Sequence, residues 1–335
     1  MPTRTALLRL LCDGRFHSGA ELGAALGIGR SAVWKHVRAL AGRGIEIHAV
    51  RGRGYRLAVP LELLDGPRIL AALPPVWRGR LAGLEILQET DSTNRVLLAR
   101  GEAVPAPCAC LAEYQSAGRG RRGRTWVSPY GRNIYLSLLW RFAEAPAALS
   151  ALGLVAGVAV LRAVTALGLG DAGLKWPNDV LWGGAKLAGV LVELSGEMNG
   201  ACRAVIGVGL NLAMPRAAAQ GIDQPWVDLA SAMGRPVSRN ACSALLLARL
   251  LECLELFQDR GFAPFAGEWH RHDVLRDRPV ALFQGGRCLH GTARGVDEQG
   301  ALIVERDGKR CRYFSGDVSL RLKEGGAVGA AAGSG

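Results

Sequence analysis

Several signatures that would place this 335-residue chain in a common class are missing from its sequence. Its eight cysteines form no C-x-x-C pair, which argues against a zinc ribbon and against a thioredoxin-type redox motif. No G-x-x-x-x-G-K-[ST] run occurs, so a P-loop is excluded and any nucleotide must be held in another way. Glycine is abundant, with 45 residues, but it follows no G-X-Y period, and this excludes collagen.

The chain also lacks a clear signal for secretion or for a membrane. Arg9 interrupts the short apolar run near the N-terminus, and no small-residue cleavage site follows it. The run Ala145–Leu161 has 17 residues without a charge, which is just short of a span, so we predict a buried helix there. We expect reduced core thiols and a cytoplasmic protein without a membrane partner.

The charge of the chain is positive and unevenly distributed. Hydrophobic residues make up 49% and charged residues 21%, which is typical of a globular protein with two or three domains. Of the net charge of +12, a large part lies in residues 1–60, where ten Lys or Arg face three Asp or Glu. Such an excess suggests a polyanionic partner for this segment, although a solvated basic surface has the same composition.

The first 60 residues predict three short helices followed by a basic hairpin. Residues 4–12 have the pattern of a short amphipathic helix, and Ser18 with Glu21 fits the capping box of a second. A third helix is predicted over 30–40. Residues 45–57 are predicted to form a β-hairpin with two arginines in its turn. This order is typical of a winged helix-turn-helix, to which we assign residues 1–62.

The exposed face of the third helix and the hairpin turn carry the residues that we expect to contact DNA. A recognition helix reads the major groove, while wing arginines contact phosphate or the minor groove. A helix-turn-helix used only for protein contacts is the alternative, but a cationic helix and a cationic turn together favour DNA. The predicted DNA-binding residues are Arg30, Ser31, Trp34, Lys35, Arg38, Arg51 and Arg53.

The most distinctive cluster of the central region is a loop rich in arginine and glycine. Residues 118–124 hold four arginines and three glycines. Glycine lets backbone N–H groups approach a ligand, and arginine supplies forked donors for phosphate or carboxylate. The loop therefore suits a polyphosphate or acyl-phosphate ligand, although a nucleic-acid-binding loop has the same composition.

Two further clusters carry candidate chemistry in a domain of α/β or α+β type. Asp179 and Lys186 follow each other across a Gly-Gly turn and could face one pocket, although a surface ion pair is the commoner explanation. Residues 207–212, with the sequence GVGLNL, predict a strand with a close backbone approach at its glycines. This stretch is not G-x-G-x-x-G, so it does not support a Rossmann site.

Taken in order, these motifs resemble those of biotin–protein ligases. The resemblance rests on DSTN at 91–94, GRGRRGRTW at 118–126, KWPND at 175–179 with KLAG after it, and GVGLNL at 207–212. With the N-terminal winged helix, the chain is similar to the bifunctional form, a ligase that is also the repressor of the biotin operon. The resemblance covers about residues 4–322. Lipoate–protein ligases share the central fold but normally lack the arginine-rich loop.

The resemblance implies an α/β (α+β) chain with a class II synthetase-like mixed sheet at its centre and an SH3-like β-barrel after it. Strands of this barrel are predicted over 279–283, 287–296, 301–305, 310–314 and 318–322. The expected domains are 1–62 for DNA binding, 63–83 as a linker, 84–272 for catalysis, 273–324 as the barrel and 325–335 as a disordered tail.

The activity implied by the resemblance uses biotin, ATP and Mg²⁺. Biotin and ATP form biotinyl-5′-AMP, and biotin then passes to one lysine of the biotin carboxyl carrier protein of acetyl-CoA carboxylase. As a repressor, the chain would bind operator DNA as a homodimer promoted by biotinyl-AMP. Two alternatives are a lipoate or octanoate ligase of the same fold and a biotin-responsive transcription factor without catalysis.

Matching the family motifs residue by residue implies a site. Lys186, Asp179 and Arg121 would be catalytic, and Asp179 would also orient Mg²⁺. Biotin would contact Ser92, Thr93, Asn94, Gln115, Gly118, Arg119, Arg121, Trp126 and Lys186. ATP and the adenylate would contact Arg121, Arg122, Arg124, Lys175, Asn178, Asn211, Trp226 and Arg321, and Asp317 would assist with Arg321.

Overall fold

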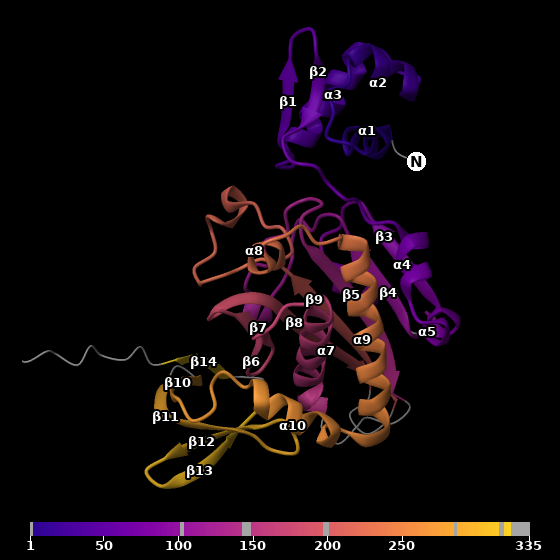
Figure 1. Ribbon diagram of the computed structural model, residues 1–335. Coiled ribbons are helices and arrows are strands. Elements are labelled where there is room, and N and C mark those ends of the chain that lie inside the picture. Colours follow the sequence, from indigo (N-terminus) through magenta and orange to yellow (C-terminus); the bar gives the residue numbers. More distant parts are fainter. Residues whose placement is uncertain are drawn as a thin grey trace, which may run out of the picture.

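The computed structural model describes residues 3–100, 104–142, 149–196, 201–284, 287–314 and 318–322, the last of these as backbone only. Figure 1 shows an N-terminal unit at the top, a large central unit and a small sheet below it. The predicted tail over 325–335 lies outside the described residues, and so does Asp317.

The N-terminal unit is the predicted winged helix. Its elements are α1 (Thr3–Leu11), α2 (Gly19–Leu26), α3 (Arg30–Ala41), β1 (Ile47–Val50) and β2 (Gly54–Leu57). The capping box is confirmed, because Ser18 accepts from the N–H of Glu21 and Glu21 accepts from the N–H of Ser18. The apolar stripe of α3, Val33 with Val37 and Leu40, is buried against α1 and α2.

A mixed seven-stranded sheet forms the central unit, in the order β3-β4-β5-β9-β8-β7-β6. Only β3 and β4 run parallel, and every other neighbouring pair is antiparallel. The strands are β3 (Gly83–Leu87), β4 (Cys108–Ala112), β5 (Ile134–Phe142), β6 (Gly173–Lys175), β7 (Asp179–Trp182), β8 (Ala185–Gly196) and β9 (Cys202–Leu210).

Helices cover this sheet and bury its core. In Figure 1, α7 (Leu152–Ala166) and α9 (Arg239–Arg260) lie side by side against it, and the two pack together. The stretch Leu149–Ala166 is long and apolar enough to cross a membrane, but 67% of it is buried inside the protein. It is the buried helix predicted from the uncharged run.

The central unit also contains shorter helices, which are α6 (Thr93–Ala99), α8 (Leu229–Met233), α10 (Ala263–His272), η1 (Arg121–Gly123), η2 (Leu149–Ala151) and η3 (Arg216–Ala219).

The segment expected to be a linker, 63–83, is folded onto the central unit. It contains α4 (Gly66–Ala72) and α5 (Pro75–Arg80), and Ile69 and Trp77 are buried in the main core. The expectation of a plain linker is therefore wrong for most of this segment. Helices of seven and six residues are too short to be predicted from periodicity alone. The apolar spacing of the segment was the one signal that the sequence offered for them.

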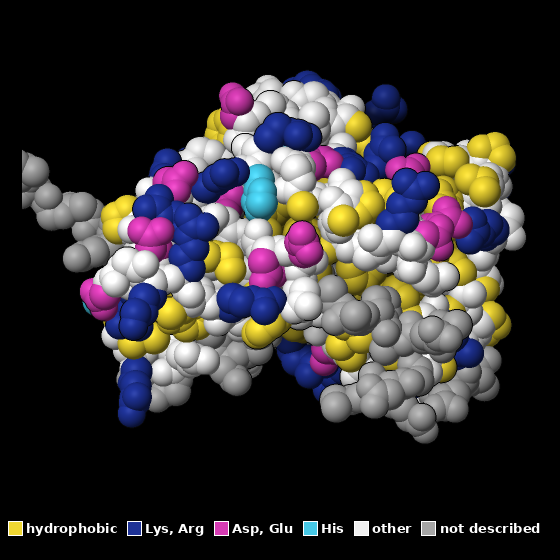
Figure 2. Space-filling model, turned by 90° about the horizontal axis from the view of Figure 1, so that it is seen from below, with side chains coloured by type: hydrophobic (Ala, Val, Ile, Leu, Met, Phe, Trp, Pro, Cys, Tyr) yellow, Lys and Arg dark blue, Asp and Glu magenta, His cyan; other side chains and the backbone are white. Residues whose placement is uncertain are grey.

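The small unit is a five-stranded antiparallel sheet in the order β13-β12-β11-β10-β14. Its strands match the predicted ones: β10 (Pro279–Gln284), β11 (Arg287–Val296), β12 (Leu302–Arg306), β13 (Lys309–Tyr313) and β14 (Val318–Leu322). Figure 2, seen from below, shows basic and acidic side chains interleaved where this sheet lies. The sheet docks on the central unit, where the buried indole N–H of Trp176 donates to the carbonyl of Gly300 at 3.2 Å.

A buried ion pair at the end of β4 joins the folded segment and α9 to the sheet. Glu113 directly follows β4 and is fully buried, and its Oε2 lies 2.6 Å from Nη1 of Arg239 at the start of α9. The other oxygen of Glu113 accepts from the N–H of Leu64 at 2.6 Å. Arg239 also donates to the carbonyls of Glu62 and Asn133. Every charge of this pair therefore has a partner, which is the condition under which burial of charge is tolerated.

We predict that Glu113→Ala lowers the free energy of unfolding by about 3–5 kcal/mol, because it leaves the Arg239 guanidinium buried without its carboxylate. Urea denaturation measures this loss. Glu252→Ala is a matched control, because it breaks the surface pair with Arg249, in which both side chains are 35% exposed. The control should cost at most about 1 kcal/mol. Equal, small losses in both variants would contradict a structural role for the buried pair.

Candidate functional site

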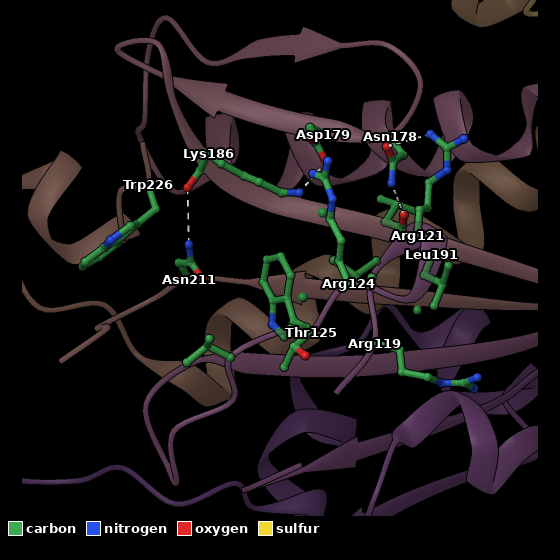
Figure 3. A pocket seen from close by; sticks show the side chains of 18 of the residues that line it. Arg119, Arg121, Arg124, Thr125, Asn178, Asp179, Lys186, Leu191, Asn211 and Trp226 are labelled. Atoms are coloured by element: carbon green, nitrogen blue, oxygen red, sulfur yellow. Dashed lines mark hydrogen bonds and ion pairs between the residues drawn. The ribbon is translucent and has the colours of Figure 1, made fainter. Parts of the chain in front are cut away.

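One cavity of about 830 Å³ lies over the face of β8 and β9 and collects the predicted site residues. Its wall is completed by the arginine loop on one side and by residues 221–226 on the other. Figure 3 shows Lys186 and Asp179 on one side of this cavity, with Asn211 and Trp226 beside Lys186. The predicted residues that line it are Ser92, Thr93, Asn94, Gln115, Arg119, Arg121, Arg122, Arg124, Trp126, Lys175, Asn178, Asp179, Lys186, Asn211 and Trp226.

The indole of Trp126 forms the floor, and two glycines make room for it. A Cβ added to Gly209 of β9 would lie 2.3 Å from the indole Cε2, and one on Gly189 of β8 would lie 3.2 Å from Cζ3. The strand predicted from GVGLNL is present, but the group that approaches Gly209 closely is the side chain of Trp126, where we predicted backbone. The buried Nε1 of Trp126 has no hydrogen-bond partner among the described residues. A ligand acceptor could satisfy this donor.

Hydroxyl and amide groups line one end of the cavity. Gln115 accepts from the backbone N–H of Thr93 at 3.0 Å, and its Nε2 donates to Ser128 at 3.1 Å. The hydroxyl oxygens of Ser137 of β5 and Thr93 lie within hydrogen-bond distance of each other, at 2.7 Å. These contacts fix the side chains of Thr93 and Gln115 before any ligand arrives. Such paired donors and acceptors suit a neutral ligand with amide-like groups.

Asn94 lies in the same part of the site, but its amide group is already hydrogen-bonded to other groups of the protein. Its Oδ1 accepts from Ser137 at 2.5 Å, and its Nδ2 donates to Glu193 at 2.7 Å and to the Leu191 carbonyl at 3.4 Å. Gly207 of β9 permits this position, because a Cβ there would lie 2.3 Å from the Oδ1. Asn94 is thus positioned to hold neighbouring groups in place.

Lys186 and Asp179 form an ion pair in the wall of the cavity. The Nζ of Lys186 lies 2.7 Å from Oδ1 of Asp179, and the two side chains are 16% and 18% exposed. Lys186 also lies 5.6 Å from the centre of the Trp126 ring. A half-buried cation held in this way is preorganised to stabilise negative charge that develops next to it.

The arginine loop closes one side of the cavity. Its turn is η1, in which Arg122 has a φ of 58° and Gly123 a φ of 72°. The Nη1 of Arg121 lies 3.5 Å from Oδ1 of Asn178. Burial lowers the pKa of the Arg121 guanidinium, Asp179 opposes this, and Arg122 and Arg124 lower it further. Several cations are therefore held close together, an arrangement that an anion would stabilise.

A buried acceptor marks the other end of the site. Asn211 donates through Nδ2 to the carbonyls of Lys186 and Val227, while its Oδ1 is buried without a hydrogen-bond partner among the described residues. Trp226 lies next to it and is half-buried (Figure 3). An acceptor beside an aromatic face suits a planar ligand that carries an N–H donor.

Magnesium can be held here only together with a ligand. No group of three or more His, Cys, Asp or Glu side chains that could hold a metal occurs in the described ranges. Of the residues that line the cavity, Asp179 and Asp223 carry carboxylates. Mg²⁺ commonly binds one or two carboxylates and completes its shell with phosphate oxygens and water. The site therefore fits Mg²⁺ carried by a phosphate ligand.

Of the predicted site residues whose side chains the structure describes, Gly118 does not line the cavity. Gly118 packs behind the wall, against Trp126, Ser128 and Gln115. Arg321 lies in β14, opposite Ala281, and its side chain lies outside the described part of the chain. Conversely, our sequence reasoning missed Ser128, Ser137 and the role of Glu193. A carboxylate at the end of an otherwise apolar strand was the one signal available for Glu193.

The basic face of the N-terminal unit matches the predicted DNA-binding residues. Arg30, Ser31, Lys35 and Arg38 are exposed on α3, and Trp34 is 48% exposed. Arg51 and Arg53 are exposed at the β1–β2 turn. The guanidinium carbon of Arg53 lies 4.2 Å from the Phe16 ring centre, and that of Arg56 lies 4.8 Å from it.

Three family models match the chain in succession. An HTH domain matches residues 3–56, the biotin/lipoate A/B protein ligase family matches 86–211, and the biotin protein ligase C-terminal domain matches 277–321. The first corresponds to the winged helix, the second to the seven-stranded sheet from the end of β3 onwards, and the third to the small antiparallel sheet.

Whole-chain relatives agree with this order. The bifunctional ligase/repressor BirA of Salmonella typhimurium is 43% identical over 318 residues, covering 95% of this chain and 97% of its own. The biotin–[acetyl-CoA-carboxylase] ligase of Mycobacterium tuberculosis is 35% identical, covering 78% and 97%. A biotin protein ligase from Aquifex aeolicus, solved with biotin and ATP, is 30% identical, with a TM-score of 0.63 over 72% of this chain and 99% of its own. The chain therefore belongs to the biotin protein ligases, in the bifunctional form that joins a ligase to a helix-turn-helix repressor.

Proposed function

We propose that this chain activates biotin with ATP to biotinyl-5′-AMP and transfers biotin to a lysine of the biotin carboxyl carrier protein. One observation carries this proposal. A single cavity joins a recess lined by hydroxyl and amide groups, a lysine that is ion-paired with Asp179, and a buried acceptor beside an aromatic ring. These three parts suit the ureido ring, the reacting carboxylate and the adenine in turn. The family membership of the chain supports the same activity.

The biotin head would occupy the recess formed by Ser92, Thr93 and Gln115. All three line the cavity, and Ser92 and Thr93 are each 4% exposed. The ureido ring carries two N–H donors and one carbonyl acceptor, which hydroxyl and carboxamide groups match. The apolar floor at Trp126 would cover the valeryl chain, because an apolar chain gains free energy when it leaves water.

Lys186 would act where the carboxylate of biotin meets the α-phosphate of ATP. In the first step a carboxylate oxygen of biotin attacks the α-phosphorus of ATP, the bond to the β-phosphate oxygen breaks, and pyrophosphate leaves. In the second step the carrier amine attacks the biotinyl carbonyl, loses a proton, and AMP leaves. Both steps place negative charge near the Lys186 ammonium, which Asp179 holds in position at 2.7 Å. Bound Mg²⁺ would neutralise phosphate charge.

The arginine loop would contact the phosphates and shield the intermediate. Arg121, Arg122 and Arg124 line the cavity next to Asn178 and Lys175. A mixed anhydride hydrolyses readily, so a wall that excludes water until the carrier arrives would protect it. At the far end, the free Oδ1 of Asn211 would accept from the adenine amino group, and Trp226 would stack on the base.

We predict that Lys186→Ala lowers biotin-dependent ATP–pyrophosphate exchange by about 10²–10³-fold, because it removes the preorganised cation from the developing charge. Isotope exchange between pyrophosphate and ATP measures this directly. In the unaltered protein, exchange should depend on biotin and not on lipoate, and mass spectrometry should find one biotinyl group added to the carrier. Exchange driven by lipoate would favour the lipoate ligase alternative. No exchange with either acid would favour a transcription factor without catalysis.

We predict that Gly209→Ala weakens biotin binding at least about tenfold, which corresponds to about 1.4 kcal/mol. The added methyl group would collide with the Trp126 indole, so the floor of the cavity must shift. Isothermal titration with biotin measures the change. Gly170→Ala is the matched control, because its Cβ would meet nothing within 4 Å and its φ is not in the left-handed region. Unchanged affinity in Gly209→Ala would contradict the floor assigned to Trp126.

The N-terminal unit would act as the repressor of biotin genes. Its exposed α3 residues would read the major groove, and Arg51 and Arg53 would contact the DNA backbone. One unit offers one recognition helix, so a palindromic operator would require a homodimer. Biotinyl-AMP would promote that dimer if it binds the dimer more tightly than the monomer. Sedimentation with and without biotin and ATP tests this part of the proposal.

We predict that Lys35→Ala weakens binding to a biotin operator and reduces the slope of affinity against salt by about one. Lys35 is exposed on α3 and far from the cavity residues in the sequence, so pyrophosphate exchange should stay unchanged. Fluorescence anisotropy over a range of salt concentrations gives the slope. Arg249→Ala, on the surface of α9, is the control and should leave the slope as it is. An unchanged slope for Lys35→Ala would remove this residue from the interface.

A further inference from the structure

We propose that Glu193 is a positioning residue that fastens the base of the arginine loop to the sheet and thereby limits the escape of the adenylate. Glu193 lies near the end of β8 and does not line the cavity. Its two carboxylate oxygens point to two different parts of the site. The inference rests on the proposed adenylate chemistry and adds a residue that acts on the loop.

One oxygen of Glu193 is held by the buried core of the site. Its Oε2 accepts from Nδ2 of Asn94 at 2.7 Å, and Asn94 is only 3% exposed. Asn94 is itself fixed by Ser137, whose hydroxyl donates to its Oδ1 at 2.5 Å. A buried amide whose donor and acceptor are both satisfied has little freedom to turn. The position of the Glu193 carboxylate is therefore set by β5 and α6.

The other oxygen of Glu193 holds the loop. Its Oε1 lies 3.2 Å from Nη2 of Arg119. In Figure 3 the Arg119 side chain points away from Lys186 and Asp179, so it does not share in the charge cluster of the cavity. Arg119 lies at the base of a small hairpin, because it bridges to Thr125 and the N–H of Trp126 donates to the carbonyl of Gly118. The contact thus joins the base of the loop to β8.

The exposure of this pair suggests a contact that can open. The side chains of Arg119 and Glu193 are 41% and 26% exposed. A pair of this kind contributes at most about 1 kcal/mol, which corresponds to about a fivefold change in an equilibrium. That is enough to keep the loop closed most of the time, and weak enough to let a carrier lysine reach the intermediate. A fully buried pair would hold the loop too firmly for transfer.

Glu193→Gln separates the two contacts. The glutamine carbonyl can still accept from Asn94, while its NH₂ group then faces the Arg119 guanidinium as one donor against another. We expect dissociation of preformed biotinyl-5′-AMP to become about two- to fivefold faster. Arg119→Gln breaks the same contact from the exposed side and should give the same increase. The dissociation rate is measured by chasing labelled adenylate with unlabelled adenylate.

Two further comparisons distinguish a positioning role from a loss of stability. Glu252→Gln breaks a surface pair of similar exposure on α9 and should leave the dissociation rate unchanged. The double variant Glu193→Gln with Arg119→Gln should release the adenylate no faster than either single variant, since both changes remove one contact. A wild-type rate in Glu193→Gln, or an additive effect in the double variant, would overturn the inference. If the unaltered protein forms no biotin adenylate at all, the proposed function fails instead.

Discussion

The buried pair of Glu113 and Arg239 is the constraint on which the site depends. It occupies the point where the folded segment after the winged helix, the end of β4 and the start of α9 meet. Gln115, which fixes Thr93, is only two residues beyond Glu113. Because an isolated buried charge is costly, both partners must be in place together, so the recess at one end of the cavity is built only when all three segments are assembled.

Space for the ligand floor is a second requirement, and glycine supplies it. At Gly209 a side chain would overlap the Trp126 indole, and at Gly207 it would overlap Asn94. Strands β8 and β9 therefore give up side-chain packing on this face, and an aromatic ring and an amide fill the room. The sequence analysis detected the close approach from the glycine spacing, but not which groups approach. That information lies in long-range contacts between β9 and segments about 80 and 110 residues earlier in the chain.

Local patterns were enough for much of the fold. The capping box at Ser18 and the α3 stripe are short-range signals, and the elements they predict are present. The Asp179–Lys186 pair was left open by the sequence, because seven residues across a turn do not fix a register. The bulge in the pairing of β7 with β8 brings the two side chains together. Helices α4 and α5 were missed, because helices this short owe their stability to burial of Ile69 and Trp77 and not to periodicity.

Lys186 links the Trp226 end of the cavity to the ion pair with Asp179. Its N–H donates to the carbonyl of Pro225, and its carbonyl accepts from the N–H of Val227, so Trp226 is held between two bonds to the same residue. Asn211 donates to that carbonyl as well. The side chain of Lys186 meanwhile points to Asp179. Under the proposed function, a nucleotide that stacks on Trp226 would thus contact a segment that is bonded to the backbone of the proposed charge-stabilising lysine. Nucleotide binding and the placement of Lys186 would then be coupled, because residue 226 bridges to Lys186 near the start of β8.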